Sequence, residues 1–338
     1  MNIEKAGVAK KNLDSLVLLR GIAVCMVCLC HFATAFWSKN SLFEYGKYGV
    51  QAFFVISGFV IPLSLLKGNF SWNNYHRFIY KRFIRLYPPY LAALAVTLIL
   101  LFIKSKLHHA PFPESSADII KSLFYAKIPE DNPVFWTLIV EAQYYLFIGC
   151  FFLLFFNYFK TTSYILFPLL LVLSQTTFLQ SITFLHFIVF FFIGNVGFLI
   201  HEKLGKATIN YIVLLALVVY TATFYNTPEL ISAIATIIFI LTFKKPIPRF
   251  FHFTGEISYS IYLIHYPLAL MIINLLRRVI SDNYVWLIFI ITTSFIFIVS
   301  WIFYKVFEEY CEALSKKVKY TKVLNKEKVK GILAVTID

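Results

Sequence analysis

The sequence predicts an all-α polytopic integral membrane protein with about ten transmembrane helices and both termini in the cytoplasm. Hydrophobic residues make up 59% of the 338 residues and charged residues only 14%, whereas a soluble globular domain carries about 25% charged residues. A chain this apolar has too few polar groups to cover its surface in water, so lipid is its expected solvent. The composition therefore excludes an ordinary soluble domain.

Ten apolar runs account for this composition, if about 20 residues cross the membrane once. They lie at residues 13–36, 48–66, 86–103, 136–156, 164–179, 182–200, 209–224, 229–243, 257–276 and 285–307. We expect one membrane domain, residues 13–307, between a cytoplasmic N-terminal segment, residues 1–12, and a basic cytoplasmic tail, residues 308–338. The first run is too long for a cleavable signal peptide and lacks a small-residue cleavage site, so we expect it to remain as the first helix.

Positive charge sets the predicted orientation. With the N-terminus inside, the inner segments hold 21 lysines and arginines and the outer segments hold 8. Cytoplasmic loops of membrane proteins carry such an excess of basic residues, so both termini are predicted to be cytoplasmic. The formal net charge of +14 is thus attributed to orientation, and no binding of nucleic acid is predicted.

The five cysteines are expected to be packing residues. Cys25, Cys28 and Cys30 lie in one apolar run, while Cys150 and Cys311 stand alone. Although Cys25 and Cys28 have the spacing of a metal-binding pair, no second Cys or His pair stands nearby to complete a tetrahedral site. The sequence therefore predicts neither a disulfide framework nor a metal site.

Two ionisable residues share one face of the first predicted helix. Such residues are unfavourable in a membrane, so each is a candidate functional group or a paired structural group. Arg20 and His31 are 11 residues apart, which is three turns plus roughly 20° and about 16.5 Å along the helix. His31 falls in the outer half. The alternative for Arg20 is a side chain that reaches back to the cytoplasmic surface.

Glu141 lies in the fourth predicted helix, about 7 Å below the outer surface and near the predicted depth of His31. A carboxylate that reaches an imidazole holds its tautomer and stabilises the imidazolium, which suits a general base acting on a hydroxyl. This pairing favours catalysis, and a buried ion pair without a catalytic role is the alternative.

Arg82 and Arg85 follow the second predicted helix in a basic segment on the inner side. If the segment is helical, the two side chains are neighbours and repel mildly unless an anion bridges them. Arginine suits a bidentate grip on phosphate, so the spacing predicts a phosphorylated ligand at the cytoplasmic mouth. Positive-inside charge alone is the alternative reading.

The ninth predicted helix carries a polar stripe. Ser258, Tyr262 and His265 are roughly one helical turn apart and share one face. The stripe is typical of a lined cavity, and hydrogen bonding between helices is the alternative.

In combination, these motifs resemble the membrane-bound acyltransferase family 3, whose members O-acylate bacterial glycans and related molecules. The resemblance is carried, in order, by Leu13–Leu16, Arg20–Ala23 with His31, Phe53–Phe59, Arg82–Pro88, Trp136–Glu141 with Gln143, Tyr144 and Tyr145, and Ser258–Leu263 with His265. It spans Leu13 to about Glu308 and implies a ten-helix acyltransferase. Two departures are Val17 and Ala142, where many relatives carry an acidic residue.

The resemblance implies acyl-CoA as co-substrate, most simply acetyl-CoA, with its phosphates held by Arg82 and Arg85 and with Arg20 deeper. It also implies that His31 is the catalytic residue. We expect His31, oriented by Glu141 or by another helix, to take the proton of an acceptor hydroxyl as that hydroxyl attacks the thioester. Ser258, Tyr259 and His265 are expected to supply oxyanion or acceptor contacts.

The expected acceptor is a cell-surface glycan, a glycolipid or a lipid-linked sugar, and the expected location is the bacterial cytoplasmic membrane. Membrane lipids and glycan-assembly enzymes are further expected partners. Some relatives carry a fused extracytoplasmic hydrolase-like domain. Here we expect the membrane domain to complete the transfer alone or to pass the acyl group to a separate partner.

Three alternatives remain open at this stage. One is an acyl-histidine or acyl-cysteine relay. Another is a non-enzymatic exporter or flippase of polysaccharide or lipid-linked sugar, in which the polar groups line a translocation path. A proton-coupled transporter is less favoured, because no internal repeat or broken helix pair marks a substrate site at the membrane midplane.

Overall fold

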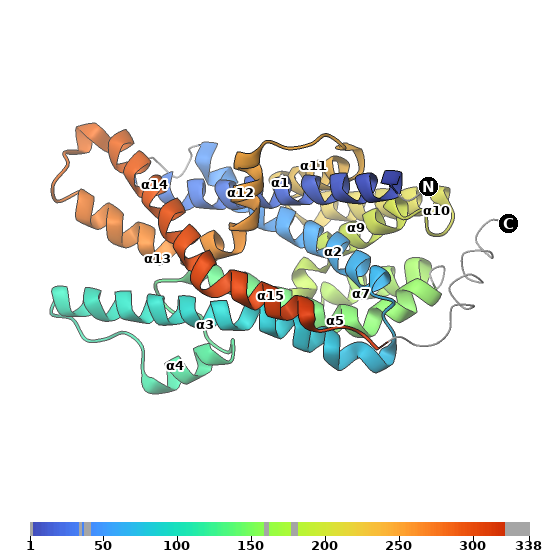
Figure 1. Ribbon diagram of the computed structural model, residues 1–338, viewed down its shortest axis with the longest axis horizontal. Coiled ribbons are helices and arrows are strands. Elements are labelled where there is room, and N and C mark those ends of the chain that lie inside the picture. Colours follow the sequence, from blue (N-terminus) through green and yellow to red (C-terminus); the bar gives the residue numbers. More distant parts are fainter. Residues whose placement is uncertain (1–2, 34–35, 37–41, 159–161, 177–181, 322–338) are drawn as a thin grey trace.

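The computed structural model describes residues 3–33, 36, 42–158, 162–176 and 182–321, and within these ranges the chain is helical and contains no strand (Figure 1). Eight helices of this described part are long and apolar enough to cross a membrane. An all-α polytopic membrane protein is therefore confirmed.

The eight candidate membrane-spanning elements are joined by shorter helices. The long helices are α1 (Ile3–Ala33), α2 (Gly49–Lys67), α3 (Tyr75–Leu107), α5 (Trp136–Asn157), α9 (Thr183–His201), α10 (Ala207–Phe224), α13 (Ser258–Leu276) and α14 (Val285–Phe303), the last continuing through a π-helical turn (Tyr304–Glu308) into α15 (Glu309–Lys317). The shorter ones are α4 (Ser116–Leu123), α7 (Phe167–Ser174), α11 (Thr227–Thr242) and α12 (Arg249–Glu256).

The two remaining predicted crossings are short. The run at 164–179 appears as a π-helical turn (Thr162–Leu166) followed by α7, which has eight residues, and residues 177–179 lie outside the described part. The run at 229–243 is α11, with 16 residues, which is shorter than a typical crossing. The exact number of crossings stays a prediction.

Three helices extend well beyond their apolar runs, and the first of them, α1, begins at Ile3 rather than at residue 13. Helix α3 begins at Tyr75 rather than 86, so the basic segment that carries Arg82 and Arg85 is helical. The last continues past 307 to Lys317, so the predicted tail begins as a helix. Hydropathy detects where a helix meets lipid, whereas the helix itself continues as long as its backbone bonds and contacts permit.

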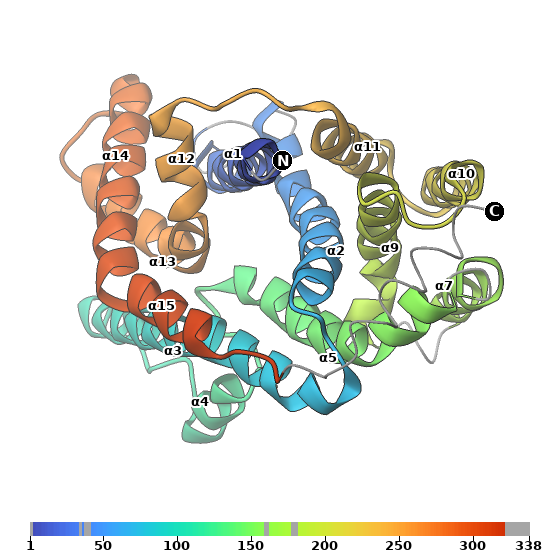
Figure 2. The ribbon, with the colours of Figure 1, turned by 45° about the vertical axis from the view of Figure 1, so that its right-hand side comes forward.

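Five helices surround the middle of the molecule. In Figure 2, α1, α2, α3, α5 and α13 are arranged around it, and α9, α10 and α11 lie on the far side of α2. The first turn of α1 and the last turn of α15 lie toward the same end of the long axis (Figure 1). Two termini on one side of the membrane require this arrangement, and the location of both termini in the cytoplasm stays a prediction.

The helix pair α2 and α9 is packed through glycines. A Cβ atom at Gly58 would lie 2.2 Å from the carbonyl oxygen of Phe191, and one at Gly194 would lie 2.2 Å from that of Val55. Neither backbone oxygen can move without shifting its helix. Small residues permit this close approach, which stabilises helix pairs in lipid through dense contact.

We expect Gly58→Ala to destabilise the folded protein by about 1–3 kcal/mol, the usual cost of overpacking a close-packed interior. Thermal unfolding of the purified protein in a fixed detergent measures the effect. Ala95→Val on the exposed face of α3 is the control, since it also adds side-chain volume. An unchanged melting temperature in Gly58→Ala would contradict this packing.

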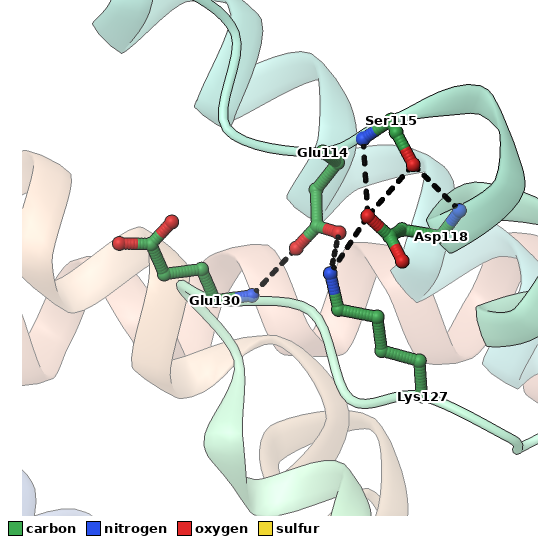
Figure 3. Close-up of polar contacts among 5 residues, drawn as sticks. All are labelled: Glu114, Ser115, Asp118, Lys127 and Glu130. Atoms are coloured by element: carbon green, nitrogen blue, oxygen red, sulfur yellow. Dashed lines mark hydrogen bonds and ion pairs between the residues drawn. The ribbon is translucent and has the colours of Figure 1, made fainter.

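Ion pairs among Glu114, Asp118 and Lys127, called the latch below, hold together the segment between α3 and α5 (Figure 3). The buried Glu114 carboxylate accepts from Lys127 Nζ at 2.8 Å and from the backbone N–H of Glu130 at 3.0 Å. Lys127 also lies 3.1 Å from Asp118 Oδ2. Glu114 raises the pKa of Lys127, and hydrogen bonds from Ser115 and then from Lys127 lower the pKa of Asp118.

This segment folds back along α3. The hydroxyl of Tyr87 donates to the carbonyl oxygen of Leu123 at 2.8 Å, although Tyr87 lies 20 residues before the end of α3. The buried Asn132 amide donates to Thr97 Oγ1 of α3 at 3.0 Å and to the carbonyl oxygen of Leu263 of α13 at 3.1 Å. The returning loop is thus fixed to two helices that border the middle of the molecule.

Candidate active site

A cavity of about 870 Å³, called the first cavity below, lies among α1, α2, α3, α5 and α13. Its polar lining residues are Arg20, Ser57, Arg82, Arg85, Thr137, Glu141, Tyr145, Ser258, Tyr259 and Tyr262. Six of the eight site residues proposed from the sequence are in this list, and they come from four helices far apart in the chain. His31 and His265 are not among the described residues that line it.

The first cavity is a cationic site. Arg20, Arg82 and Arg85 line it, and none of the ion pairs found among the described residues involves any of these three side chains. The Arg82 guanidinium lies over the Tyr145 ring, with its carbon 5.4 Å from the ring centroid, and its buried Nε has no hydrogen-bond partner. Three arginines without a carboxylate in ion-pair range can hold an anion with several oxygens.

Glu141 belongs to the wall of the first cavity. Its Oε1 accepts a hydrogen bond from Ser57 Oγ of α2 at 3.2 Å and another from the hydroxyl of Tyr145, one turn along α5. The similar predicted depth of Glu141 and His31 in the membrane suggests a pairing of these side chains. The structure does not bring these two together, since Glu141 contacts hydroxyl groups in the cavity wall and His31 lies against α13.

His31 and His265 form a pair of imidazoles from α1 and α13. Their ring centroids are 5.3 Å apart, and the Tyr266 ring meets His31 edge-on at 5.0 Å. His265 is fully buried and His31 is half-buried. The Tyr262 ring, which lines the first cavity, is 5.8 Å from His265. The two imidazoles therefore lie next to the first cavity, on the far side of the Tyr262 ring.

The tautomer of neutral His265 follows from its partners. Its Nδ1 lies 3.1 Å from the carbonyl oxygen of Ile261 and 2.9 Å from that of Tyr262. Because carbonyl oxygens only accept, Nδ1 carries the proton and Nε2 of the neutral ring is an acceptor. This buried Nε2 has no hydrogen-bond partner. It is a free acceptor on a ring that stands beside His31.

Ser258 and Tyr259 line the first cavity, but their hydroxyl groups are already engaged. Ser258 Oγ donates to the carbonyl oxygen of Gly255 at 2.8 Å, and the Tyr259 hydroxyl donates to that of Leu86 at 2.9 Å. In this conformation neither proton is free for an oxyanion. The two residues shape the cavity, and the second bond also ties α13 to α3 next to the prolines of α3.

Sequence reasoning missed Glu308, which it assigned to the tail. The carboxylate is buried and accepts from the backbone N–H of Ser260 at 3.1 Å and from Ser260 Oγ at 2.5 Å. It therefore fixes the first turn of α13 directly beside Ser258 and Tyr259. Its sequence signal is an acidic residue at the end of a long apolar run, but nothing local distinguishes it from Glu309, which is exposed.

A second cavity of about 610 Å³ lies beside the first, between α3 and α5. The two share a wall, called the shared wall below, of Arg82, Leu86, Leu138, Glu141, Tyr145 and Tyr259. The second cavity is otherwise lined by Ile79, Phe83, Tyr87, Tyr125, Ala142 and Leu146. Burial there raises the pKa of the Tyr125 phenol.

Comparison with known proteins gives a consistent picture. A family model for an acyltransferase domain matches residues 13–305. The peptidoglycan O-acetyltransferase OatA of Listeria monocytogenes is 27% identical to the chain over an alignment of 176 residues, and the match covers 47% of this chain and 27% of OatA. The chain thus spans about a quarter of the length of that relative. No solved structure matches.

Proposed function

Because the chain belongs to the acyltransferase 3 family, we propose that it is a membrane O-acyltransferase that moves an acyl group, most simply acetyl, from acyl-CoA to a hydroxyl group of a glycan or glycolipid. The observation that carries this proposal is the first cavity. It combines three arginines that lack carboxylate partners with a wall that leads to two imidazoles. Enzyme-family membership also favours this reading over the exporter and the proton transporter.

The arginines support acyl-CoA as the donor. The phosphates of CoA supply the anionic oxygens that Arg82 and Arg85 lack, with Arg20 deeper in the same cavity. With the phosphates held there, the pantetheine arm directs the thioester past Tyr262 toward His31. The donor then approaches from the cytoplasm, in agreement with the positive-inside orientation. A bacterial cytoplasmic membrane is the proposed location.

In the chemical step, His31 takes the proton from the acceptor hydroxyl as its oxygen attacks the thioester carbonyl. The new C–O bond forms, the C–S bond breaks, and the CoA thiolate leaves and is protonated. His265 replaces Glu141 as the group that orients His31, since its free Nε2 can accept the His31 N–H once the rings, 5.3 Å apart, adjust. In a catalytic triad a carboxylate orients the histidine that acts as the base, and here the neutral imidazole of His265 takes the place of that carboxylate.

Binding of acetyl-CoA tests the donor site. We expect Arg82→Ala and Arg85→Ala each to weaken binding about 10- to 100-fold, because hydrogen bonds to charged groups contribute about 1.5–3 kcal/mol. Equilibrium binding to protein in detergent at fixed ionic strength is the measurement.

The two substitutions are also combined in one double variant, Arg82→Ala with Arg85→Ala. Its control is Arg77→Ala with Lys81→Ala, which removes two positive charges from the same helix without touching the described cavity lining. Equal losses in both double variants would mean that net charge alone attracts the nucleotide. That result would overturn the donor site.

A further inference from the structure

The second cavity opens toward lipid. Phe83 of α3 and Leu146 of α5 line it, and these residues are 49% and 53% exposed. Both lie in elements long and apolar enough to cross a membrane. Leu146 lies in the middle of the apolar run of α5, so its exposed side chain faces lipid rather than water, and Phe83 of α3 lines the same cavity. The cavity is therefore accessible sideways, from the bilayer.

The two cavities differ in chemistry. Three arginines line the first, whereas Arg82 and Glu141 are the only charged residues among those that line the second, and both belong to the shared wall. Beyond that wall the second cavity is aliphatic and aromatic, with Ala142 leaving space on the α5 side. A neutral hydrocarbon chain fits this lining, and a polyanionic nucleotide does not.

Tyr125 forms part of the second cavity at a position that strains its backbone. It follows α4 with φ 58°, in the left-handed region, and its N–H bonds to the carbonyl oxygen of Ser122 at 3.2 Å. Glycine is the usual residue at such a helix end. The Tyr125 ring lies 4.3 Å from the Tyr90 ring, and the latch of Figure 3 closes the loop that carries it. A bulky residue in a strained position points to a use for its side chain.

We propose that the second cavity binds the hydrocarbon chain of a lipid-borne acceptor, whose hydroxylated head passes over the shared wall into the first cavity. This rests on the proposed function, which places acyl-CoA in the first cavity. A water-soluble donor has no need of an opening toward lipid, whereas an acceptor that resides in the bilayer arrives through one. The acyl chain of the donor is excluded by position, because it lies at the far end of pantetheine from the phosphates, and the second cavity adjoins Arg82.

Photo-crosslinking in lipid nanodiscs tests the proposal. The probe is dodecyl β-glucoside with a diazirine near the end of its chain, and labelled peptides are mapped by mass spectrometry. We expect saturable labelling at Phe83 and Leu146. Ala142→Leu fills the second cavity without adding to the described lining of the first. It is expected to reduce this labelling about tenfold or more, because a hydrocarbon chain that loses the burial of about two methylene groups binds about tenfold more weakly.

A matched pair of variants controls for general lipid contact. Leu146→Trp narrows the opening and should lower the labelling, whereas Leu154→Trp changes an equally exposed leucine on the same helix, 50% against 53%, that lines neither described cavity. Leu154→Trp should leave the labelling unchanged. Equal labelling in Ala142→Leu and wild type overturns the proposal.

Competition identifies the source of the chain. Displacement of the probe by unlabelled dodecyl glucoside and not by palmitoyl-CoA supports an acceptor, and the reverse pattern assigns the cavity to the donor and overturns the proposal. Acetyl-CoA binding is measured on the same samples and should be retained in Ala142→Leu. If Arg82→Ala weakens the binding of acetyl-CoA as expected but Ala142→Leu leaves the probe labelling unchanged, the donor site is supported and the inference about the acceptor is wrong.

Discussion

Replacing His31 with alanine is expected to lower kcat for acetyl transfer by about 10²- to 10⁴-fold, the contribution of a positioned general base. The affinity for acetyl-CoA should stay within about twofold, because His31 does not line the cationic first cavity and the loss then falls on the chemical step alone. Alanine is the best helix former, so α1 should remain intact. Release of CoA in the presence of acceptor, measured in membranes, reports the rate.

His186→Ala is the matched control for this variant. It also removes an imidazole from a candidate membrane-spanning helix, but His186 lies in α9 beside Phe187 and Tyr225 and lines neither described cavity. Full activity in His31→Ala would exclude His31 as the base. Equal losses in both variants would assign the effect to stability.

Much of the fold was predictable because lipid imposes a simple rule. Each crossing needs a long apolar helix whose backbone N–H and C=O groups hydrogen-bond to one another within the helix. Composition and run length therefore located all eight long helices. The same rule failed at helix ends. Tyr75 and Lys317 lie outside the apolar runs, and hydropathy carries no information on how far a helix continues past lipid.

The candidate site was predictable where the signal is local. Arg82 and Arg85 are one turn apart, so a helical segment was enough to place them together. The partnership of Glu141 with His31 was inferred from depth, which fixes neither the rotation of a helix nor its neighbours. The structure turns Glu141 toward Ser57 and Tyr145 and gives His31 a partner from α13. Glu308 depends on tertiary contact with Ser260, and no local pattern reveals it.

The role of His265 gives the second large expected effect, and two amide isosteres separate its functions. Asparagine places its amide N–H where Nδ1 bonds the carbonyl oxygens of Ile261 and Tyr262, but it has no group at the Nε2 position. Glutamine places a carbonyl oxygen at the Nε2 position and gives up the Nδ1 bond. A structural role predicts that His265→Asn is the better tolerated variant. A role in positioning His31 predicts the opposite order.

We expect kcat of His265→Asn to fall about 10- to 100-fold. The variant loses the hydrogen bond to His31, which becomes charged in the chemical step, and hydrogen bonds to charged groups contribute about 1.5–3 kcal/mol. His265→Gln should retain about tenfold more activity than His265→Asn, and KM for acetyl-CoA should stay unchanged in both. In a His31→Ala background, His265→Asn should add little further loss, because residues that act as a unit are not additive. Additive losses, or an asparagine variant as active as wild type, would leave His265 a packing residue. His31 would then need another group to hold its tautomer, because a neutral imidazole can take a hydroxyl proton only on the nitrogen that carries no proton.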